Sequence, residues 1–582
     1  MKRSAAATQS VVRNILYAGA ITGAVVLISV GIIQPLEAEV RWLICLWMSA
    51  PLLGLAIWMR LPMLPPGLTR TISNTGLVVI IGFVMLSLQL LRQQVVRADE
   101  IYNYVAIGSD GSSTSNVRPV LHSQRILRGR MVDRKGVVLV DSQSVNGFAQ
   151  RIYPIAERYD LAAFSHLTGF FSTRYGQSGL ESFYNPYLTG ERGNEWQQLR
   201  ERMLGETVQG NDLTLTIDAD LQAAVAGALG ARTGSVVVLD PRTGAILALV
   251  SYPGFDPRGL TFDPSAMSWE AENQRLSQYW DQLMADGAQQ PLLNRATQGL
   301  YPPGSTYKTV TAIGLLERPS IGQANTISCP ETYTPQVGAP PVVNARPGLG
   351  ELIGEPATLE RVYAYSCNTA FAQYAVRLGP ELMEETAARF DILPPQRAGE
   401  SYPSFRELPT AQSLLYTEPG FLNLPHALAD TGYGQGALLV TPLQMALVTA
   451  AIANDGVMMQ PYLVQRINRP DGGEISRHEP RAIRRAMSAR SARLMRENMA
   501  AVARYGFGSS VDDVTPPGVT VGGKSGTAEH VPGARPHAWF IALAPLDNPR
   551  YAVAVMVEGG GEGSGAGAEL AGRVLAAAFA SE

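Results

Sequence analysis

Cysteine and histidine are scarce in this chain of 582 residues, and neither is arranged for metal binding. The three cysteines, Cys45, Cys329 and Cys367, are too few and too widely spaced for the disulfide framework of a small secreted domain. The six histidines form no HExxH pair and no cysteine–histidine zinc spacing. We therefore predict no metal and no cofactor, and we expect Cys367 to be a buried free thiol.

Runs of basic residues are also absent, and the formal net charge is only −3. A nucleic-acid-binding surface usually appears as a basic patch, so the sequence predicts no nucleic-acid partner. Lysine itself is rare, because arginine supplies nearly all of the positive charge and lysine occurs only at positions 2, 135, 308 and 524. A lysine in the middle of this chain therefore needs a chemical reason.

Apolar runs long enough to cross a membrane occur at about 14–33, 42–59 and 72–91. About 20 helical residues span the roughly 30 Å hydrocarbon core of a bilayer. The alternative is a signal peptide followed by buried helices, but no small-residue cleavage site follows the first run. We therefore predict a membrane region over residues 1–94 with three transmembrane helices.

The distribution of charged residues predicts the orientation of these helices. Basic residues precede the first run and flank the loop between the second and third runs: Lys2, Arg3, Arg13, Arg60 and Arg70. The loop between the first two runs holds Glu37 and Glu39 and only one basic residue, Arg41. Because short cytoplasmic loops are enriched in lysine and arginine, we expect the N-terminus and the second loop in the cytoplasm. Everything after Arg92 is then on the outer side of the plasma membrane.

Beyond the membrane region, the sequence changes character near residue 211. Residues 95–210 mix short β-like runs with glycine-rich turns, and we interpret them as a non-catalytic domain, the pedestal. Residues 211–582 begin with a strand (LTLTID), a helix (ADLQAAVAGALGA) and two strands, and end with two strands (HAWFIAL, YAVAVMVEG) and an alanine-rich helix. The predicted fold class is α+β, with a C-terminal antiparallel sheet flanked by helices.

The segment YPPGSTYKTVTAIGLLE contains the lysine that needs explaining. Its PPG sequence blocks a helix upstream, whereas the residues that follow favour a helix beginning at Ser305. Residues three apart share one helix face, so we expect the Lys308 amine beside the Ser305 hydroxyl. A lysine whose pKa is lowered by burial from about 10.4 to roughly 7–8 can take the serine proton. The alternative is an ordinary helix cap beside a solvated lysine.

Two later segments favour the chemical explanation. YSCNTAF places Ser366 and Asn368 two residues apart. VGGKSGTAEH places four candidate residues on a predicted strand: Lys524, Ser525, Gly526 and Thr527. Two of the four lysines therefore lie where acyl transfer through a serine requires an amine.

The three motifs and their order resemble the SxxK, SxN and K[ST]G motifs of penicillin-binding proteins. The flanking segments RGRMVDRKGVVL, DPRTGAILALVSYPGFDP and GYGQGALLVTPLQMALVTAAIANDG are similar to the class B, monofunctional branch. The resemblance covers about residues 90–582. It implies a serine-type peptidoglycan D,D-transpeptidase that β-lactams acylate and inhibit. The pedestal, 95–210, would be of the dimerisation type, and the transpeptidase domain would be 211–582.

The same resemblance implies roles for the first two motifs. Ser305 would attack a stem peptide that ends in D-Ala-D-Ala, and Lys308 would take the serine proton. Ser366 would relay a proton to the leaving D-alanine, and Asn368 would bond the substrate amide. An amine from a neighbouring stem peptide would then resolve the ester and form the cross-link.

The third motif would bind the end of the substrate. By resemblance, Lys524, Ser525 and Thr527 hold the terminal carboxylate, with Gly526 between them in the motif. The backbone amides of Ser305 and Thr527 would form the oxyanion hole.

Two features depart from the family pattern. Cys367 stands where many relatives have aspartate, and three membrane spans are predicted where one is usual. Glu529 and His530 follow the third motif and suggest a general base, but a surface role at the end of a strand is expected.

Three different functions could use a similar domain. A β-lactamase would need a deacylating base in a recognisable motif, and the sequence shows none. A membrane-bound β-lactam sensor would need an effector in the cytoplasm, where the predicted topology leaves only short segments. A non-catalytic scaffold for a glycan polymerase is also compatible with the sequence.

No glycosyltransferase region is expected between the last apolar run and residue 210, because the segment lacks the length and the acidic motif. Glycan polymerisation must then come from another protein. The resemblance implies an integral-membrane SEDS-type polymerase as the partner.

Overall fold

The computed structural model describes residues 2–32, 34, 39–60, 67–93, 97, 105–107, 113–115, 124–193, 208–322, 326–397 and 405–581. The chain forms two compact units, Met1–His122 and Ser123–Glu582. The predicted boundary between the membrane region and the pedestal, at residues 94 and 95, lies outside the described residues.

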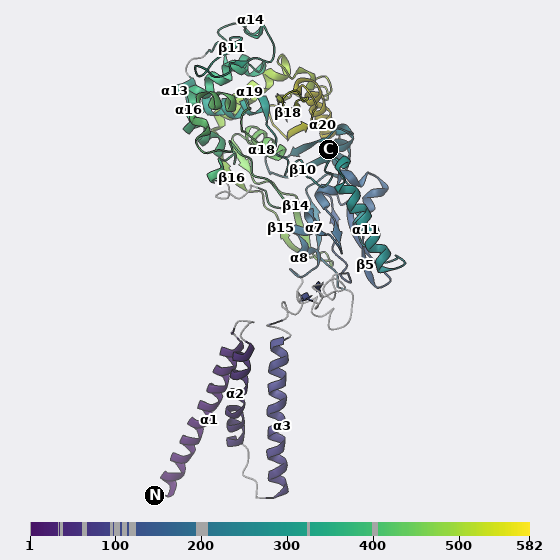
Figure 1. Ribbon diagram of the computed structural model, residues 1–582, viewed down its shortest axis with the longest axis vertical. Coiled ribbons are helices and arrows are strands. Elements are labelled where there is room, and N and C mark those ends of the chain that lie inside the picture. The colour runs from purple at the N-terminus through teal and green to yellow at the C-terminus, as the bar shows by residue number, and fades with distance from the viewer. Residues whose placement is uncertain are drawn as a thin grey trace. The chain divides into compact units, whose positions relative to one another are not determined.

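Three long helices form the first unit (Figure 1) and carry the three apolar runs. They are α1 (Lys2–Ile32), α2 (Glu39–Arg60) and α3 (Leu68–Leu91). Each contains 21 or 22 residues that are long and apolar enough to cross a membrane, so the three helices have the properties of a membrane anchor. The loops at 33–38 and 61–66, on which the predicted orientation depends, lie outside the described residues apart from Gln34.

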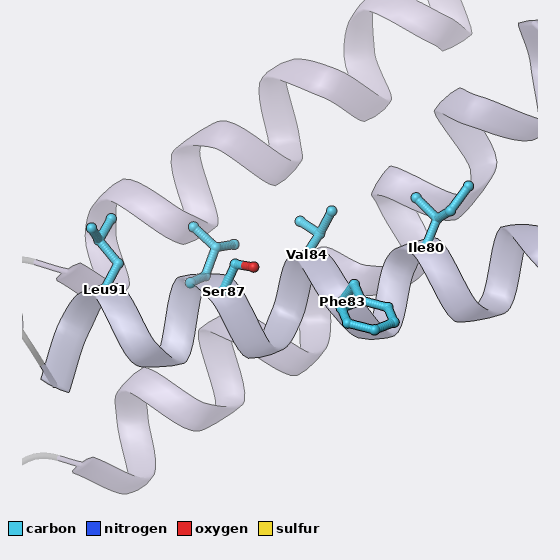
Figure 2. A pocket seen from close by; sticks show the side chains of 6 residues that line it. Ile80, Phe83, Val84, Ser87 and Leu91 are labelled. Atoms are coloured by element: carbon cyan, nitrogen blue, oxygen red, sulfur yellow. The ribbon is translucent and has the colours of Figure 1, made fainter.

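Polar contacts join the anchor helices at one end. The Trp42 indole donates a hydrogen bond to Gln89 Oε1 at 2.6 Å, and the Arg92 guanidinium donates to the Gly31 carbonyl at 3.0 Å. A hollow of about 550 Å³ on α3 (Figure 2) is lined by Ile80, Phe83, Val84, Ser87, Leu88 and Leu91. A surface of this composition suits lipid chains or another apolar helix.

A six-stranded sheet in the second unit combines strands from distant parts of the chain, in the order β15-β14-β8-β3-β4-β5. The strands are β3 (Met131–Val132), β4 (Val138–Val145), β5 (Phe148–Ile152), β8 (Asp212–Leu215), β14 (Val464–Asn468) and β15 (Glu474–Arg477). β8 pairs in parallel with β3 and antiparallel with β14. The β14–β15 hairpin therefore joins the C-terminal half of the chain to the pedestal.

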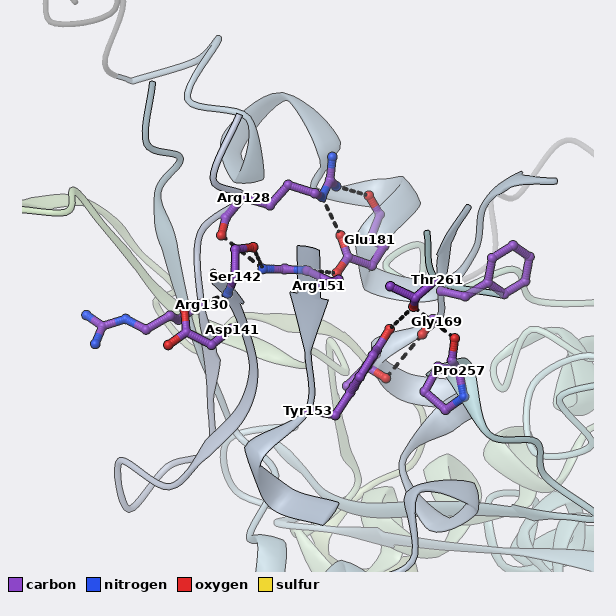
Figure 3. A network of polar contacts seen from close by, with 12 residues as sticks. Arg128, Arg130, Asp141, Ser142, Arg151, Tyr153, Gly169, Glu181, Pro257 and Thr261 are labelled. Carbon is purple, nitrogen blue, oxygen red and sulfur yellow. Dashed lines mark hydrogen bonds and ion pairs between the residues drawn. The ribbon is translucent and has the colours of Figure 1, made fainter. Parts of the chain in front are cut away.

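A buried ion network fastens this sheet to a short helix, α7 (Gly179–Phe183), as Figure 3 shows. Glu181 accepts hydrogen bonds from Arg128 Nε and Arg151 Nε, each at 2.7 Å. Burial alone would raise the pKa of Glu181, but the two guanidinium groups hold it below its ordinary value. Loss of either arginine would leave the buried Glu181 carboxylate with one cation fewer and destabilise the fold. The intact network therefore stabilises the pedestal.

The central sheet of the second unit is antiparallel, in the order β10-β9-β19-β18-β17. The strands are β9 (Gly234–Leu239), β10 (Ile246–Tyr252), β17 (Gly522–Ala528), β18 (His537–Ala544) and β19 (Tyr551–Val557). Alternate side chains enter two different cores, because successive residues of a strand point to opposite faces. The predicted α+β class is confirmed. The sheet is not purely C-terminal, however, because β9 and β10 from the start of the domain complete it.

Helices cover both faces of the central sheet. On one face lie α10 (Ala219–Leu229) and α20 (Ala568–Ala580), whose apolar side chains share a core with Val236 and Val238. On the other lie α12 (Lys308–Leu316) and α18 (Pro442–Ala453), which share a core with Val237. The remaining elements that surround the site are α15 (Leu359–Ala364), α16 (Asn368–Ala388), α17 (Pro425–Gly432), α19 (Ala489–Arg504), β11 (Thr332–Tyr333) and β12 (Val342–Val343).

Candidate active site

The first motif begins at a turn that requires glycine. Gly304 has a φ of +54°, and a Cβ added there would lie 2.5 Å from the Thr527 carbonyl oxygen. The chain then forms a 3₁₀ turn, η6 (Gly304–Tyr307), which continues into α12. Ser305 therefore lies in a tight turn against β17. The sequence predicts an α-helix that begins at this serine, but the α-helix begins one turn later, at Lys308.

The Lys308 amine is buried and bonded to the second motif. Its Nζ donates to the Ser366 carbonyl at 2.7 Å, to Ser366 Oγ at 3.0 Å and to Asn368 Oδ1 at 2.7 Å. Within the described residues, no hydrogen bond joins this amine to the Ser305 hydroxyl. Burial, and then the charge of Lys524, lowers the pKa of Lys308 well below its ordinary value. A neutral amine still has two N–H bonds for the Ser366 carbonyl and Asn368, and its lone pair is left to accept a proton.

Lys524 approaches the same serine from β17. Its Nζ donates to Ser366 Oγ at 3.0 Å and to the Ser525 carbonyl at 2.9 Å. Burial lowers the pKa of Lys524 to about 7, and no carboxylate contributes to the shift. The charge of Lys524 therefore depends on pH near neutrality. A bound anion would favour the charged form.

Ser366 connects the two lysines. Its backbone φ is +59°, a left-handed conformation that is unfavourable for a residue with a side chain and is often found at functional sites. The Ser366 backbone NH donates to the Tyr363 carbonyl at 3.1 Å, which holds the turn between α15 and α16. The hydroxyl group lies within hydrogen-bond distance of both amines, and this is the geometry that a proton relay needs.

The other residues of the third motif border the first motif. A Cβ on Gly526 would lie 2.9 Å from the Pro303 carbonyl oxygen, so β17 packs directly on the turn that carries Ser305. Ser525 is buried, and the Thr527 hydroxyl accepts a hydrogen bond from the Gly563 backbone NH at 3.3 Å. The structure thus brings the predicted residues of all three motifs into one region.

The prediction of a free thiol at Cys367 is wrong. Cys329 and Cys367 form a disulfide with their Cα atoms 6.2 Å apart, although 38 residues separate them in the sequence. Cys367 lies between Ser366 and Asn368, so the bond attaches the second motif to the segment that precedes β11. Spacing alone did not show this pair, because pairing depends on how the folded chain brings the two residues together. Cys45 is the free cysteine among the described residues.

Replacing both Cys329 and Cys367 with serine is expected to lower the free energy of unfolding of the catalytic domain. A disulfide that closes a loop of 38 residues restricts the unfolded chain and contributes about 3–4 kcal/mol. Denaturant unfolding of the double variant, compared with Cys45→Ser as the control, measures the difference. An unchanged unfolding midpoint in the double variant would contradict the prediction.

Glu529 and His530, which follow the third motif, are exposed. The His530 ring stacks on His537, with ring centroids 3.9 Å apart. His537 Nδ1 in turn accepts a hydrogen bond from the Gly559 backbone NH at 3.1 Å. These contacts belong to the edge of the sheet and agree with the expected surface role.

Sequence reasoning missed one further contact of the second motif. Asn344, which follows β12, accepts a hydrogen bond from the Asn368 backbone NH at 3.0 Å. Its surroundings, VVNARP, contain no motif, so no sequence signal identifies it. The disulfide did have a usable signal, since Cys367 lies inside a motif of a domain predicted to be outside the cytoplasm.

These features define a class of protein. The site of a serine acyltransferase needs a serine on a tight turn and a nearby base, and here a buried lysine of lowered pKa follows the serine. A second serine lies between this amine and that of a second buried lysine. Residues 234–579 match the family profile described as the penicillin binding protein transpeptidase domain. Residues 128–213 match the penicillin binding protein A dimerisation domain.

Similar proteins give the same result. The peptidoglycan D,D-transpeptidase PbpA of Mycobacterium tuberculosis H37Rv is 34% identical over 514 residues, which are 85% of this chain and 94% of that protein. MrdA of Escherichia coli K12, also a peptidoglycan D,D-transpeptidase, is 28% identical over 429 residues, 67% of this chain and 63% of that protein. The ceftriaxone acyl-enzyme structure of penicillin-binding protein A from M. tuberculosis has a TM-score of 0.68 at 32% identity, over 79% of this chain and 100% of that chain.

The chain belongs to the penicillin-binding protein transpeptidase family, in its class B branch. The predicted family and the predicted transpeptidase activity are confirmed, and the matches do not favour the sensor or the scaffold.

Proposed function

We propose that this protein cross-links peptidoglycan by D,D-transpeptidation, with Ser305 as the residue that is acylated. The observation that carries the proposal is the buried Lys308 amine, whose pKa is well below its ordinary value and which lies one turn from Ser305. The names of the relatives, peptidoglycan D,D-transpeptidases, and the β-lactam acyl-enzymes among the similar structures support it.

The first half of the reaction forms an ester. Lys308 takes the Ser305 proton, and Ser305 Oγ attacks the carbonyl carbon of the penultimate D-alanine of a stem peptide. Collapse of the tetrahedral intermediate breaks the peptide bond, and the leaving D-alanine nitrogen receives a proton through Ser366, which lies between the two lysines. Asn368, which already accepts a hydrogen bond from Lys308, also forms a hydrogen bond with the substrate amide.

The third motif binds the stem peptide that donates the acyl group and polarises its reacting carbonyl. Lys524, charged when a carboxylate binds, holds the C-terminus of the stem peptide with the hydroxyls of Ser525 and Thr527. The backbone amides of Ser305 and Thr527 stabilise the oxyanion, and the absence of a side chain at Gly526 lets β17 approach the nucleophile turn. The amine of a second stem peptide then attacks the ester, releases Ser305 and forms the cross-link.

An exchange assay tests this function. The full-length protein in detergent, given a synthetic stem peptide that ends in D-Ala-D-Ala and a fluorescent D-amino acid, is expected to replace the terminal D-alanine with the label. Chromatography of the peptide measures the product, and protein pretreated with penicillin is the control. A β-lactam sensor would be acylated by penicillin but would give no exchange. A scaffold would give neither result.

We further infer that the catalytic domain lies outside the cytoplasm. The disulfide supports this orientation, because structural disulfides persist in oxidising compartments. A reporter that is active only outside the cytoplasm is expected to work when fused after Arg97 or near Glu37, and to fail near Pro65. A reporter active only in the cytoplasm should give the reciprocal pattern. The same activity at all three positions would refute three spans.

The domain boundaries and the polymerase partner belong to the same proposal. We assign residues 1–94 to the membrane region, 95–210 to the pedestal and 211–582 to the transpeptidase domain, with the β14–β15 hairpin contributing to the pedestal sheet. As the resemblance to class B penicillin-binding proteins implies, an integral-membrane SEDS-type polymerase would supply the glycan strands. The apolar hollow on α3 is a suitable surface for its contact within the membrane.

A further inference from the structure

Asn344 caps the helix that carries the second motif, although it lies far from that helix in the sequence. Its Oδ1 accepts hydrogen bonds from the backbone NH groups of Asn368 and Thr369, at 3.0 and 3.2 Å. Its Nδ2 donates to the Pro330 carbonyl at 2.9 Å. The first NH groups of a helix have no partner within the helix, so Asn344 supplies acceptors that α16 itself lacks.

The residue before Asn344 holds the side chain of Asn368. The Val343 carbonyl accepts a hydrogen bond from Asn368 Nδ2 at 3.0 Å. Because the amide nitrogen is directed to this carbonyl, the amide oxygen is directed to Lys308, whose Nζ lies 2.7 Å away. Two consecutive residues therefore fix both the backbone and the side-chain orientation of Asn368.

The segment that contains Asn344 is itself held against the second motif. Pro330, at the beginning of the same segment, accepts a hydrogen bond from the Thr369 hydroxyl at 2.8 Å. The neighbouring Cys329 forms the disulfide with Cys367. Asn344 thus acts from a firmly attached support, and its effect reaches Lys308 through Asn368.

We propose that Asn344 is a positioning residue for acylation, which orients Asn368 and through it the amine of Lys308. The proposal rests on the proposed roles of Ser305 and Lys308. Asn344 does not contact the reacting atoms, so its loss should change the rate of the chemical step and leave the initial binding of a β-lactam nearly unchanged. The expected loss in the acylation rate constant is about 10- to 100-fold, the effect of small displacements of a reacting group.

The pH profile separates positioning from simple stabilisation. Acylation needs neutral Lys308, so the rate falls as the pH drops through the pKa of this amine. In Asn344→Ala, the backbone of Asn368 loses its cap, so the Asn368 oxygen is held less closely to Lys308 and stabilises its ammonium form less. The acid limb should then move to lower pH. Asn344→Asp keeps an oxygen for the Asn368 and Thr369 amides, although it loses the bond to the Pro330 carbonyl. Its negative charge should move the acid limb to higher pH. Lys524, the other titratable amine near Lys308, is unchanged in both variants.

The experiment measures the acylation rate constant and the initial dissociation constant of a chromogenic β-lactam against pH, with thermal unfolding as the test of folding. Ser268→Ala is the matched control, since Ser268 caps α11 (Trp269–Met284) by accepting from the Ala271 backbone NH at 3.2 Å. The control should lower thermal stability without moving the acid limb. If Asn344→Ala does not fold, Asn344→Asp provides the test alone.

Opposite shifts in the two Asn344 variants would support the proposal. Variants that fold and acylate with the wild-type profile, or that lose rate with no movement of the acid limb, would overturn it. Labelling of Ser305→Ala would refute the proposed nucleophile. Unchanged acylation by the Asn344 variants would refute only the positioning role.

Discussion

Replacing Ser305 with alanine is expected to abolish covalent labelling by a fluorescent penicillin. The label is an ester of the nucleophile, so a side chain without oxygen leaves no atom for the β-lactam carbonyl to join. The loss should be complete on a gel, since removal of a nucleophile of this kind lowers the rate by about 10⁶-fold. The fold should persist, because Ser305 is only partly buried.

The control for this experiment is Ser320→Ala, an exposed serine a short distance along the chain. This variant should be labelled as strongly as the wild type, and thermal unfolding should be similar in all three proteins. A Ser305→Ala protein that is folded and still labelled would show that another residue is the nucleophile.

Replacing Lys308 with arginine is expected to slow acylation by about 10²- to 10⁴-fold, an increase in the barrier of roughly 3–5 kcal/mol. The substitution keeps a cation but removes the base, because arginine does not lose its proton in a protein. The rate constant with a chromogenic β-lactam measures the effect. Thermal unfolding shows whether the larger side chain has disturbed the packing.

Lys524→Arg is the comparison that separates proton transfer from charge. Lys524 binds a carboxylate as a cation, so arginine should retain more activity there than at position 308. The pKa of Lys524 is about 7, so the affinity of the wild type for a carboxylate-containing β-lactam should decline as the pH rises above about 7. This alkaline decline should be absent in Lys524→Arg.

If folded Lys308→Arg acylates near the wild-type rate, Lys308 is not the base.

Local sequence patterns determined a large part of the secondary structure and the chemistry of the site. The apolar runs of the first unit form three helices, and the strand-like runs of the last domain form β8, β9, β10, β18 and β19. These features follow from periodicity and hydropathy over short windows, where neighbours in sequence decide the structure. The three motifs were also local, and they supplied the chemical types that acyl transfer requires.

The tertiary structure decided which of these groups meet. Lys308 bonds Ser366 and Asn368, which lie 58 and 60 residues further along the chain. The disulfide and the Asn344 cap also join residues that are distant in the sequence. The β14–β15 hairpin of the transpeptidase domain likewise pairs into the sheet of the pedestal. No short window contains both partners of any of these contacts, which is why the sequence predicted a free thiol and gave no sign of Asn344.

The protonation of the two lysines was likewise decided by the fold. From the sequence, Lys308 requires a lowered pKa to act as a base, and Lys524 is expected to hold the terminal carboxylate. In the structure both amines are fully buried next to one hydroxyl group, so burial lowers both pKa values and the charge of Lys524 becomes sensitive to pH. The sequence specifies where an amine is, but its proton affinity depends on the water that the folded chain removes and on the charges that it brings close.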